Sequence, residues 1–96
     1  MIAELDRGRP VVLAMMITES FCASSNGVVP AANPGADIDY HAVLAVAHGH
    51  EEGEQLVLAR NSGGTGWGLG GYGWLEMGYV VPRLIGIAMM GDERVT

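Results

Sequence analysis

The chain has 96 residues, which is enough for one small domain, so residues 1–96 are expected to form a single unit. Hydrophobic residues make up 49% of the chain and charged residues 17%, a composition that can form a core. The net charge of −6, with 11 acidic residues, 5 arginines and no lysine, argues against binding to nucleic acid, whose phosphates attract clustered basic residues.

The sequence gives little indication of a membrane-spanning helix or of a signal peptide for secretion. No apolar run approaches the roughly 18 residues that a spanning helix needs. The start, Met1–Asp6, is too acidic for a signal peptide, which favours a cytoplasmic location. The single cysteine, Cys22, cannot form an internal disulfide.

The first third of the chain predicts a helix and a strand. Residues 2–8 have apolar side chains three apart and a glycine at the end, which is typical of a short helix with a glycine stop. Residues 11–17 are apolar without interruption and favour a strand buried on both faces, although this pattern alone leaves a helix open. Serine, asparagine, glycine and proline over residues 18–39 predict an irregular excursion with no regular element.

A β-hairpin is expected next. Residues 41–47 form the second buried strand, residues 48–54 a polar turn longer than two residues, and residues 55–60 the return strand. Strict alternation would place one set of side chains on the face of His41 and leave His48 on the other face; that set is His41, Val43, Ala45 and Ala47. On the return strand, alternation gives Asn61 the face of Val57 and Ala59. Two further strands are expected over residues 72–76 and 84–90.

A glycine-rich stretch follows the hairpin. It contains seven glycines between Asn61 and Gly73, which suits a loop with positive φ angles or close approach of other groups. Two tryptophans and a tyrosine can hold such a loop in place. A histidine that begins one strand and an asparagine that ends the next could form a pair in which the histidine is a base and the asparagine orients it.

These residues carry a family resemblance. The run His41-Ala42-Val43-Leu44-Ala45-Val46, followed by Arg60-Asn61-Ser62-Gly63-Gly64-Thr65-Gly66-Trp67-Gly68 and Gly71-Tyr72, resembles the C-terminal half of a papain-like (C1 family) cysteine peptidase. That family has a His-Ala-Val strand, then Asn-Ser-Trp-Gly-x-x-Trp-Gly, then a Gly-Tyr strand. Further matches lie at Gly8–Val12, Glu19–Phe21 and Gly27–Pro30, and at Gly71–Leu75 and Tyr79–Val80 as in bacterial members. The resemblance covers roughly residues 5–90.

The resemblance implies a mainly β fold, an antiparallel, barrel-like sheet that is one half of an α+β parent fold. It implies that His41 is the catalytic histidine and that Asn61 orients it. An imidazole can take a proton near neutral pH, and a neutral amide can accept a hydrogen bond from its other nitrogen and fix the tautomer. It also implies that Phe21, Cys22 and Tyr40 lie in the substrate-binding region, with Phe21 and Cys22 at the rim of the specificity pocket or filling it.

Three departures from the family pattern bear on activity. The nucleophilic cysteine and the oxyanion-hole glutamine belong to a helical half that this chain does not include. Gly63 stands where the family has a tryptophan that shields the histidine–asparagine hydrogen bond, and Ala47-His48 replaces the usual Gly-Tyr. The chain is therefore expected to be inactive alone and to need the helical half, in its own longer chain or in a polypeptide partner. A homo-oligomer and a non-catalytic binding or structural module in a larger complex stay open.

Three other interpretations are weaker. Cys22 could be a nucleophile, but no predicted helix begins beside it to lower the pKa of its thiol. The run His48-Gly49-His50-Glu51-Glu52 could hold a metal, but a hairpin tip of this kind is usually solvated. The GxGxxG pattern at residues 66–71 precedes a strand where a dinucleotide site needs a helix. No cofactor and no metal are therefore expected.

Overall fold

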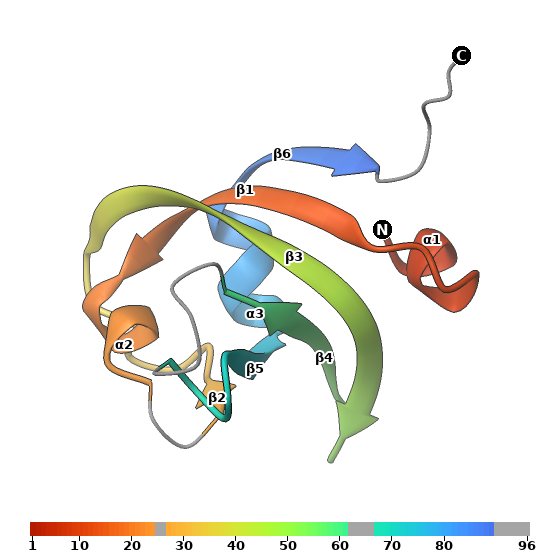
Figure 1. Cartoon of the computed structure of the whole chain (residues 1–96). Helices are drawn as coiled ribbons and strands as arrows, with labels where there is room; N and C mark the ends of the chain where they lie inside the picture. Colours follow the sequence, from red (N-terminus) through yellow and green to blue (C-terminus); the bar gives the residue numbers. More distant parts are fainter. Residues whose placement is uncertain (25–26, 62–66, 90–96) are drawn as a thin grey trace.

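The computed structural model describes residues 1–24, 27–61 and 67–89. In chain order, with their bounds, the elements are α1 (Ile2–Asp6), β1 (Val11–Thr18), α2 (Glu19–Cys22), β2 (Val28–Val29), β3 (Asp37–Glu51), β4 (Glu54–Arg60), β5 (Tyr72–Glu76), α3 (Met77–Val80), the 3₁₀ turn η1 (Val81–Arg83) and β6 (Leu84–Met89). Figure 1 shows long, strongly curved strands with the short helices beside them.

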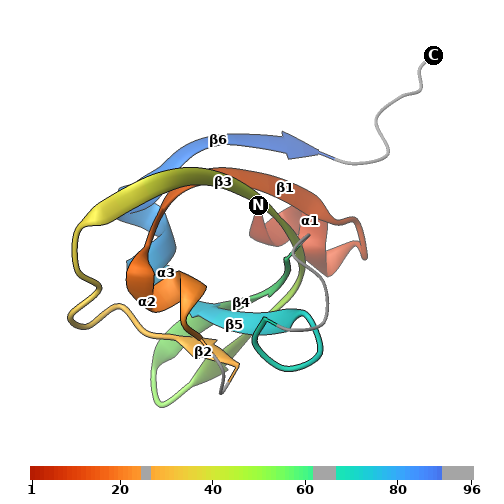
Figure 2. The ribbon, with the colours of Figure 1, turned by 60° about the vertical axis from the view of Figure 1, so that its left-hand side comes forward.

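The strands form one curved sheet in the order β2-β5-β4-β3-β1-β6. All neighbouring strands are antiparallel except β2 and β5, which are parallel. Figure 2 shows the sheet curving round into an incomplete barrel. Because β2 and β6 end the strand order without pairing with each other, the sheet is not closed. The mainly β, barrel-like architecture expected from the sequence is confirmed.

The core fills the concave side of the sheet. Every second residue of β1 is buried there, since alternate side chains of a strand point to opposite faces. β3, β4 and β5 add smaller side chains, and α3 closes the interior with Tyr79 and Val80, both 0% exposed. Each large apolar side chain that is removed from water in this way stabilises the fold by about 1.5–3 kcal/mol. The four-residue helix α3 is thus held by packing and not by its own length.

A β-bulge changes which side chains of β3 face the core. The register shifts between Ala45 and Ala47, so that Ala45 lies opposite Ala59 while His48 lies opposite Val57. Val57 and Ala59 are both buried, and directly paired residues share a face. The prediction that His48 lies on the outer face was therefore wrong, because one extra residue reverses the alternation beyond it. His48 Nε2 lies 2.6 Å from Asp6 Oδ1.

The β3–β4 hairpin is longer and its turn tighter than expected. β3 extends over Asp37–Glu51, and only Glu52 and Gly53 separate it from β4. Both have positive φ, 52° and 81°, which is the backbone of a type I′ turn and matches the twist of the two strands. The predicted turn over residues 48–54 was therefore wrong. Polar side chains there mark an exposed end of the sheet and not the loss of strand pairing.

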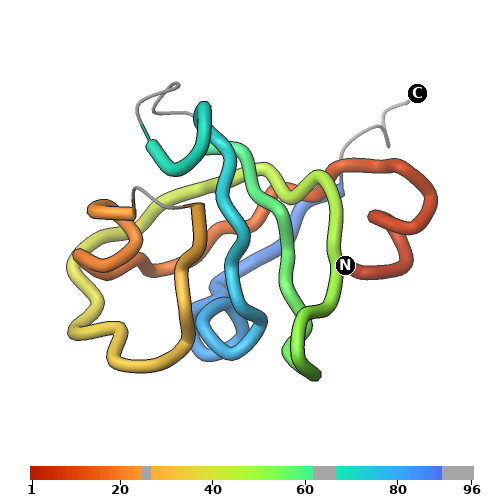
Figure 3. Tube along the Cα trace, turned by 90° about the horizontal axis from the view of Figure 1, so that it is seen from below, coloured from red at the N-terminus to blue at the C-terminus, as the bar shows by residue number. Residues whose placement is uncertain are grey.

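The segment from residue 18 to residue 39 contains regular elements that the sequence pattern did not indicate. α2 follows β1 directly, and β2 pairs with β5 through Val28 and Val29. Phe21 and Val29 are buried, at 1% and 0% exposed, and they anchor the two elements to the core. Elements of four and two residues are too short to show a hydrophobic period. Figure 3 shows that α1 and α2 lie at opposite ends of the molecule.

Candidate active site

His41 and Asn61 meet at the end of the sheet near α2. His41 lies on β3, and Asn61 directly follows β4. Leu44 lies opposite Arg60, and this register brings Asn61 diagonally across from His41 on the concave face. His41 Nε2 is 2.7 Å from Asn61 Oδ1, a hydrogen-bond distance. The structure thus brings together the two residues that the sequence singled out.

The direction of this hydrogen bond sets the state of the imidazole. An amide oxygen can only accept, so His41 must donate from Nε2, and in its neutral form Nδ1 then carries the lone pair. The Asn61 backbone N–H donates to the Gly71 carbonyl at 3.0 Å, which ties the asparagine to the glycine-rich stretch. His41 is half-buried. An oriented imidazole with its lone pair on Nδ1 has the geometry that a general base needs.

Aromatic rings pack behind the histidine. The ring of Phe21 lies edge-on to His41, with centroids 6.0 Å apart and an interplanar angle of 66°. On its other sides Phe21 contacts Trp67 at 4.8 Å and stacks with Tyr79 at 6.5 Å. The Trp67 indole donates to the Phe21 carbonyl at 2.6 Å. His41 is therefore backed by a rigid apolar wall.

The three residues expected in the substrate-binding region lie in different surroundings. Phe21 is 1% exposed, inside the wall just described. Cys22 is the last residue of α2 and is exposed. Tyr40 is 57% exposed and pairs with Met16, whereas His41 pairs with the buried Met15, so Tyr40 points to the opposite face from His41. Their role in substrate binding stays a prediction, and Gly63 lies outside the described residues.

Sequence reasoning missed the support that Tyr79 gives to this site. Tyr79 Oη accepts a hydrogen bond from the Thr18 backbone N–H at 3.0 Å and lies 3.0 Å from Thr18 Oγ1. Both residues are 0% exposed. A threonine that ends an apolar strand was the available signal, because a buried hydroxyl needs a polar partner. The sequence alone did not show which residue would supply it.

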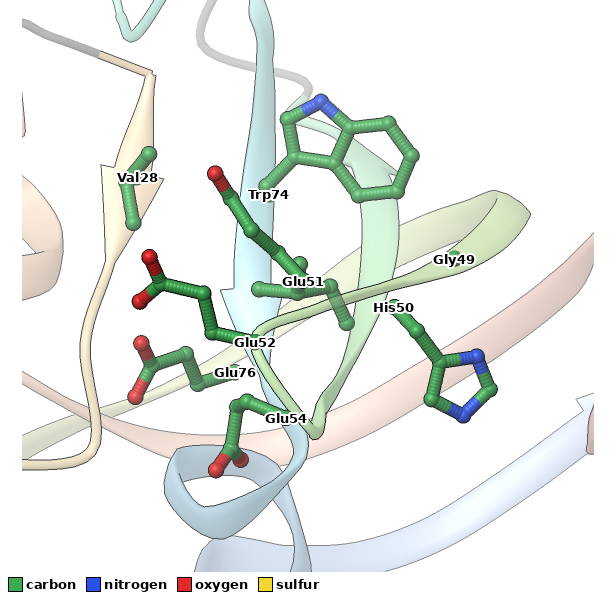
Figure 4. Close-up of a pocket in the computed structure, with 9 residues that line it drawn as sticks. Val28, Gly49, His50, Glu51, Glu52, Glu54, Trp74 and Glu76 are labelled. Atoms are coloured by element: carbon green, nitrogen blue, oxygen red, sulfur yellow. The ribbon is translucent and has the colours of Figure 1, made fainter.

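A cavity of about 490 Å³ lies on the outer side of the sheet by the β3–β4 hairpin (Figure 4). Its lining combines apolar and acidic side chains, namely Val28, Gly49, His50, Glu51, Glu52, Glu54, Leu56, Trp74 and Glu76. The ring of His50 projects away from the carboxylates of Glu52, Glu54 and Glu76 (Figure 4). Among the described residues, no group of three histidine, cysteine or acidic side chains is placed to hold a metal ion. Nor is any helix within residues 1–24, 27–61 and 67–89 long and apolar enough to cross a membrane.

Residues 1–91 match the protein family described as papain family cysteine protease. The chain is 41% identical over 83 residues to the thiol protease aleurain of Arabidopsis thaliana, covering 83% of this chain and 22% of that protein. It is 38% identical over 71 residues to a cysteine protease of Blomia tropicalis, covering 73% of this chain and 21% of the relative. The chain therefore spans about a fifth of the length of these relatives.

The fold has a solved counterpart as well. The digestive procathepsin L 3 of Tenebrio molitor superposes with a TM-score of 0.68 over 90% of this chain and 29% of its own, at 24% sequence identity. At that identity the likeness shows the fold alone. The three proteins compared come from a plant, a mite and an insect, and they give no support to the expected bacterial type.

Proposed function

The chain belongs to the papain family of cysteine proteases, and we propose that it is the part of such an enzyme that carries the catalytic histidine, His41, and its orienting asparagine, Asn61. The observation that carries this proposal is the 2.7 Å contact between His41 Nε2 and Asn61 Oδ1. The reaction is hydrolysis of a peptide bond through a thioester, and the thiol comes from the helical half of the complete enzyme.

In the acylation step, His41 Nδ1 takes the proton of that thiol, and the resulting thiolate attacks the carbonyl carbon of the peptide. The imidazolium then gives its proton to the leaving amine as the C–N bond breaks, which leaves a thioester. In the second step His41 takes a proton from water, the hydroxide displaces the thiolate, and the free acid is released. Throughout both steps Asn61 Oδ1 accepts from Nε2–H and holds the ring in one orientation.

A fusion protein tests the proposal. The upstream part of Arabidopsis aleurain, which the family resemblance identifies as the helical half with the cysteine, is joined to this chain, and hydrolysis of a fluorogenic peptide is measured with a reducing agent present. We expect turnover that an alkylating agent abolishes. A soluble, folded fusion that hydrolyses no peptide would contradict the proposal.

The chain alone is expected to hydrolyse no peptide, because His41 and Asn61 without a thiolate leave nothing to attack the carbonyl. Cys22 is exposed and lies at the C-terminal end of the four-residue α2, not at a helix N-terminus. The purified 96-residue chain is assayed with the same peptide. Thiol-dependent turnover that Cys22→Ser removes would overturn this expectation.

The second candidate is a non-catalytic binding or structural module in a larger complex. It is favoured by Gly63, which stands where the family has a tryptophan that shields the histidine–asparagine hydrogen bond. Without that shield the hydrogen bond would be weakened by water. The fusion separates the two candidates, since only the first gives hydrolysis. The bacterial type stays a prediction that rests on Gly71–Leu75 and Tyr79–Val80.

We also propose that a second polypeptide covers apolar side chains that this chain leaves exposed. That polypeptide is either the helical half or a second copy of this chain. On β6, Ile85, Ile87 and Met89 are 58%, 43% and 40% exposed. β6 also ends the sheet, so its outer edge offers backbone groups for pairing. Contiguous apolar surface of this kind favours association.

We therefore expect the chain alone to self-associate at micromolar concentration in analytical ultracentrifugation. Ile87→Lys should shift the distribution toward monomer, whereas Val81→Lys, at a residue 63% exposed on η1, should leave it unchanged. A cooperatively folded monomer for the unchanged chain, or equal effects of the two substitutions, would count against a partner surface on β6.

A further inference from the structure

We propose that Phe21 is a positioning residue for His41: its ring fixes the plane of the imidazole that the Asn61 hydrogen bond alone leaves free to turn. The inference rests on the proposed function of His41 as the catalytic base. It gives Phe21 a role different from the one expected from the sequence, where it was assigned to the rim or the filling of the specificity pocket.

The hydrogen bond to Asn61 does not by itself fix the orientation of the imidazole ring. The contact of Nε2 with Asn61 Oδ1 fixes one atom of the imidazole. The ring can still tilt about the line through that atom, and tilting moves Nδ1, the atom that must meet the thiol. A neighbouring ring in an edge-on arrangement opposes such a tilt, since aromatic pairs favour defined angles. The Phe21 ring, 6.0 Å from the imidazole at 66°, is placed to do this.

Phe21 is itself held in place by its neighbours. Its carbonyl accepts the indole N–H of Trp67, and the two rings lie 4.8 Å apart at 30°. Tyr79 covers Phe21 from another side, with the ring planes 14° from parallel. A side chain that is 1% exposed and held on these sides has little freedom to change rotamer.

Tyr79, which packs on Phe21, is in turn anchored by hydrogen bonds and by a cation–π contact. Its hydroxyl contacts the backbone N–H and the Oγ1 of Thr18, each at 3.0 Å. The Arg83 guanidinium lies 4.5 Å over the Tyr79 ring, and Arg83 Nε donates to Asp37 Oδ1 at 3.0 Å. The contacts thus run from β1 and η1 through Tyr79 and Phe21 to His41. Within the described residues, Phe21 is the aromatic side chain that packs against the His41 ring.

The test uses the full chain labelled with ¹⁵N at histidine. Nitrogen chemical shifts give the ratio of Nε2–H to Nδ1–H tautomers of neutral His41. The unchanged chain should be mainly Nε2–H, and Phe21 and His41 ring protons should show a nuclear Overhauser effect. Phe21→Leu and Phe21→Met keep an apolar side chain but remove the ring. Because a tilted ring turns Nε2–H away from Asn61 Oδ1 and weakens the hydrogen bond that favours this tautomer, we expect each substitution to lower the tautomer ratio about fivefold, the effect of losing one aromatic pair.

Val11→Ala is the matched control. Val11 is 0% exposed and lies at the far end of β1 from Thr18, so its loss destabilises the core without touching His41. It should leave the tautomer ratio unchanged. An unchanged ratio in both Phe21 variants, an equal change in Val11→Ala, or no Overhauser effect in the unchanged chain would each overturn the positioning role. If the fusion is inactive but the Phe21 variants shift the ratio, the peptidase proposal fails and the positioning role stands.

Discussion

Trp67→Ala is expected to lower the free energy of unfolding by about 3–5 kcal/mol, the range for losing a large buried aromatic side chain. Trp67 is 7% exposed, and its indole makes the hydrogen bond to the Phe21 carbonyl. It also packs directly over Gly73, where an added Cβ would lie 2.7 Å from the Trp67 ring. The substitution leaves a cavity that Gly73, with no side chain, cannot fill.

Trp74→Ala is the matched control for this prediction. Trp74 is half-buried and lines the outer cavity, so part of its ring is already in water. It should cost clearly less than Trp67→Ala, about 1.5 kcal/mol or below, since a partly exposed side chain loses less transfer free energy. Both variants are unfolded with urea at the same protein concentration. Equal losses would contradict the placement of Trp67 in the core and Trp74 outside it.

The second large effect concerns catalysis. In the aleurain fusion, His41→Ala is expected to lower kcat/KM by about 10²–10⁴-fold, the usual contribution of a general acid–base group. Asn61→Ala should lower it less, because His41 stays and loses only its orientation. The two losses should not add in the double variant, since Asn61 acts through His41. Additive losses, or a larger loss for Asn61→Ala, would contradict the assigned roles.

The pairing of His41 with Asn61 could be predicted from the sequence. His41 begins an apolar run and Asn61 ends the next one, and an antiparallel hairpin brings such positions to the same end of a sheet. β1, β4, β5 and β6 were also predictable, because their apolar residues are continuous or alternate over five residues or more. These strands and the pairing of His41 with Asn61 depend on local sequence patterns, which a β-bulge elsewhere in the sheet does not change.

The inner position of His48 could not be predicted, because it depends on the bulge between Ala45 and Ala47. A bulge leaves no sign in a run of alanine and valine. The two-residue turn at Glu52 and Gly53 was hidden for a similar reason, since glutamate with a φ of 52° is unusual.

The packing of Phe21 against His41 was hidden because it joins segments far apart in the sequence. α2 is only four residues long, so no hydrophobic period indicates which way Phe21 points. The contact depends on Trp67 and Tyr79, which enter from other elements. Tertiary packing of this kind decides the orientation of a side chain where local pattern does not.

We propose that His41, oriented by Asn61, serves as the base for a cysteine on the helical half. The pH dependence of alkylation of that cysteine in the fusion tests it most directly, with mass spectrometry to follow the modified residue. Alkylation should set in at a lower pH in the unchanged fusion, because an imidazolium beside the thiol stabilises the thiolate, and should shift toward the ordinary thiol pKa of about 8.5 in His41→Ala. The same pH profile with and without His41 would contradict it.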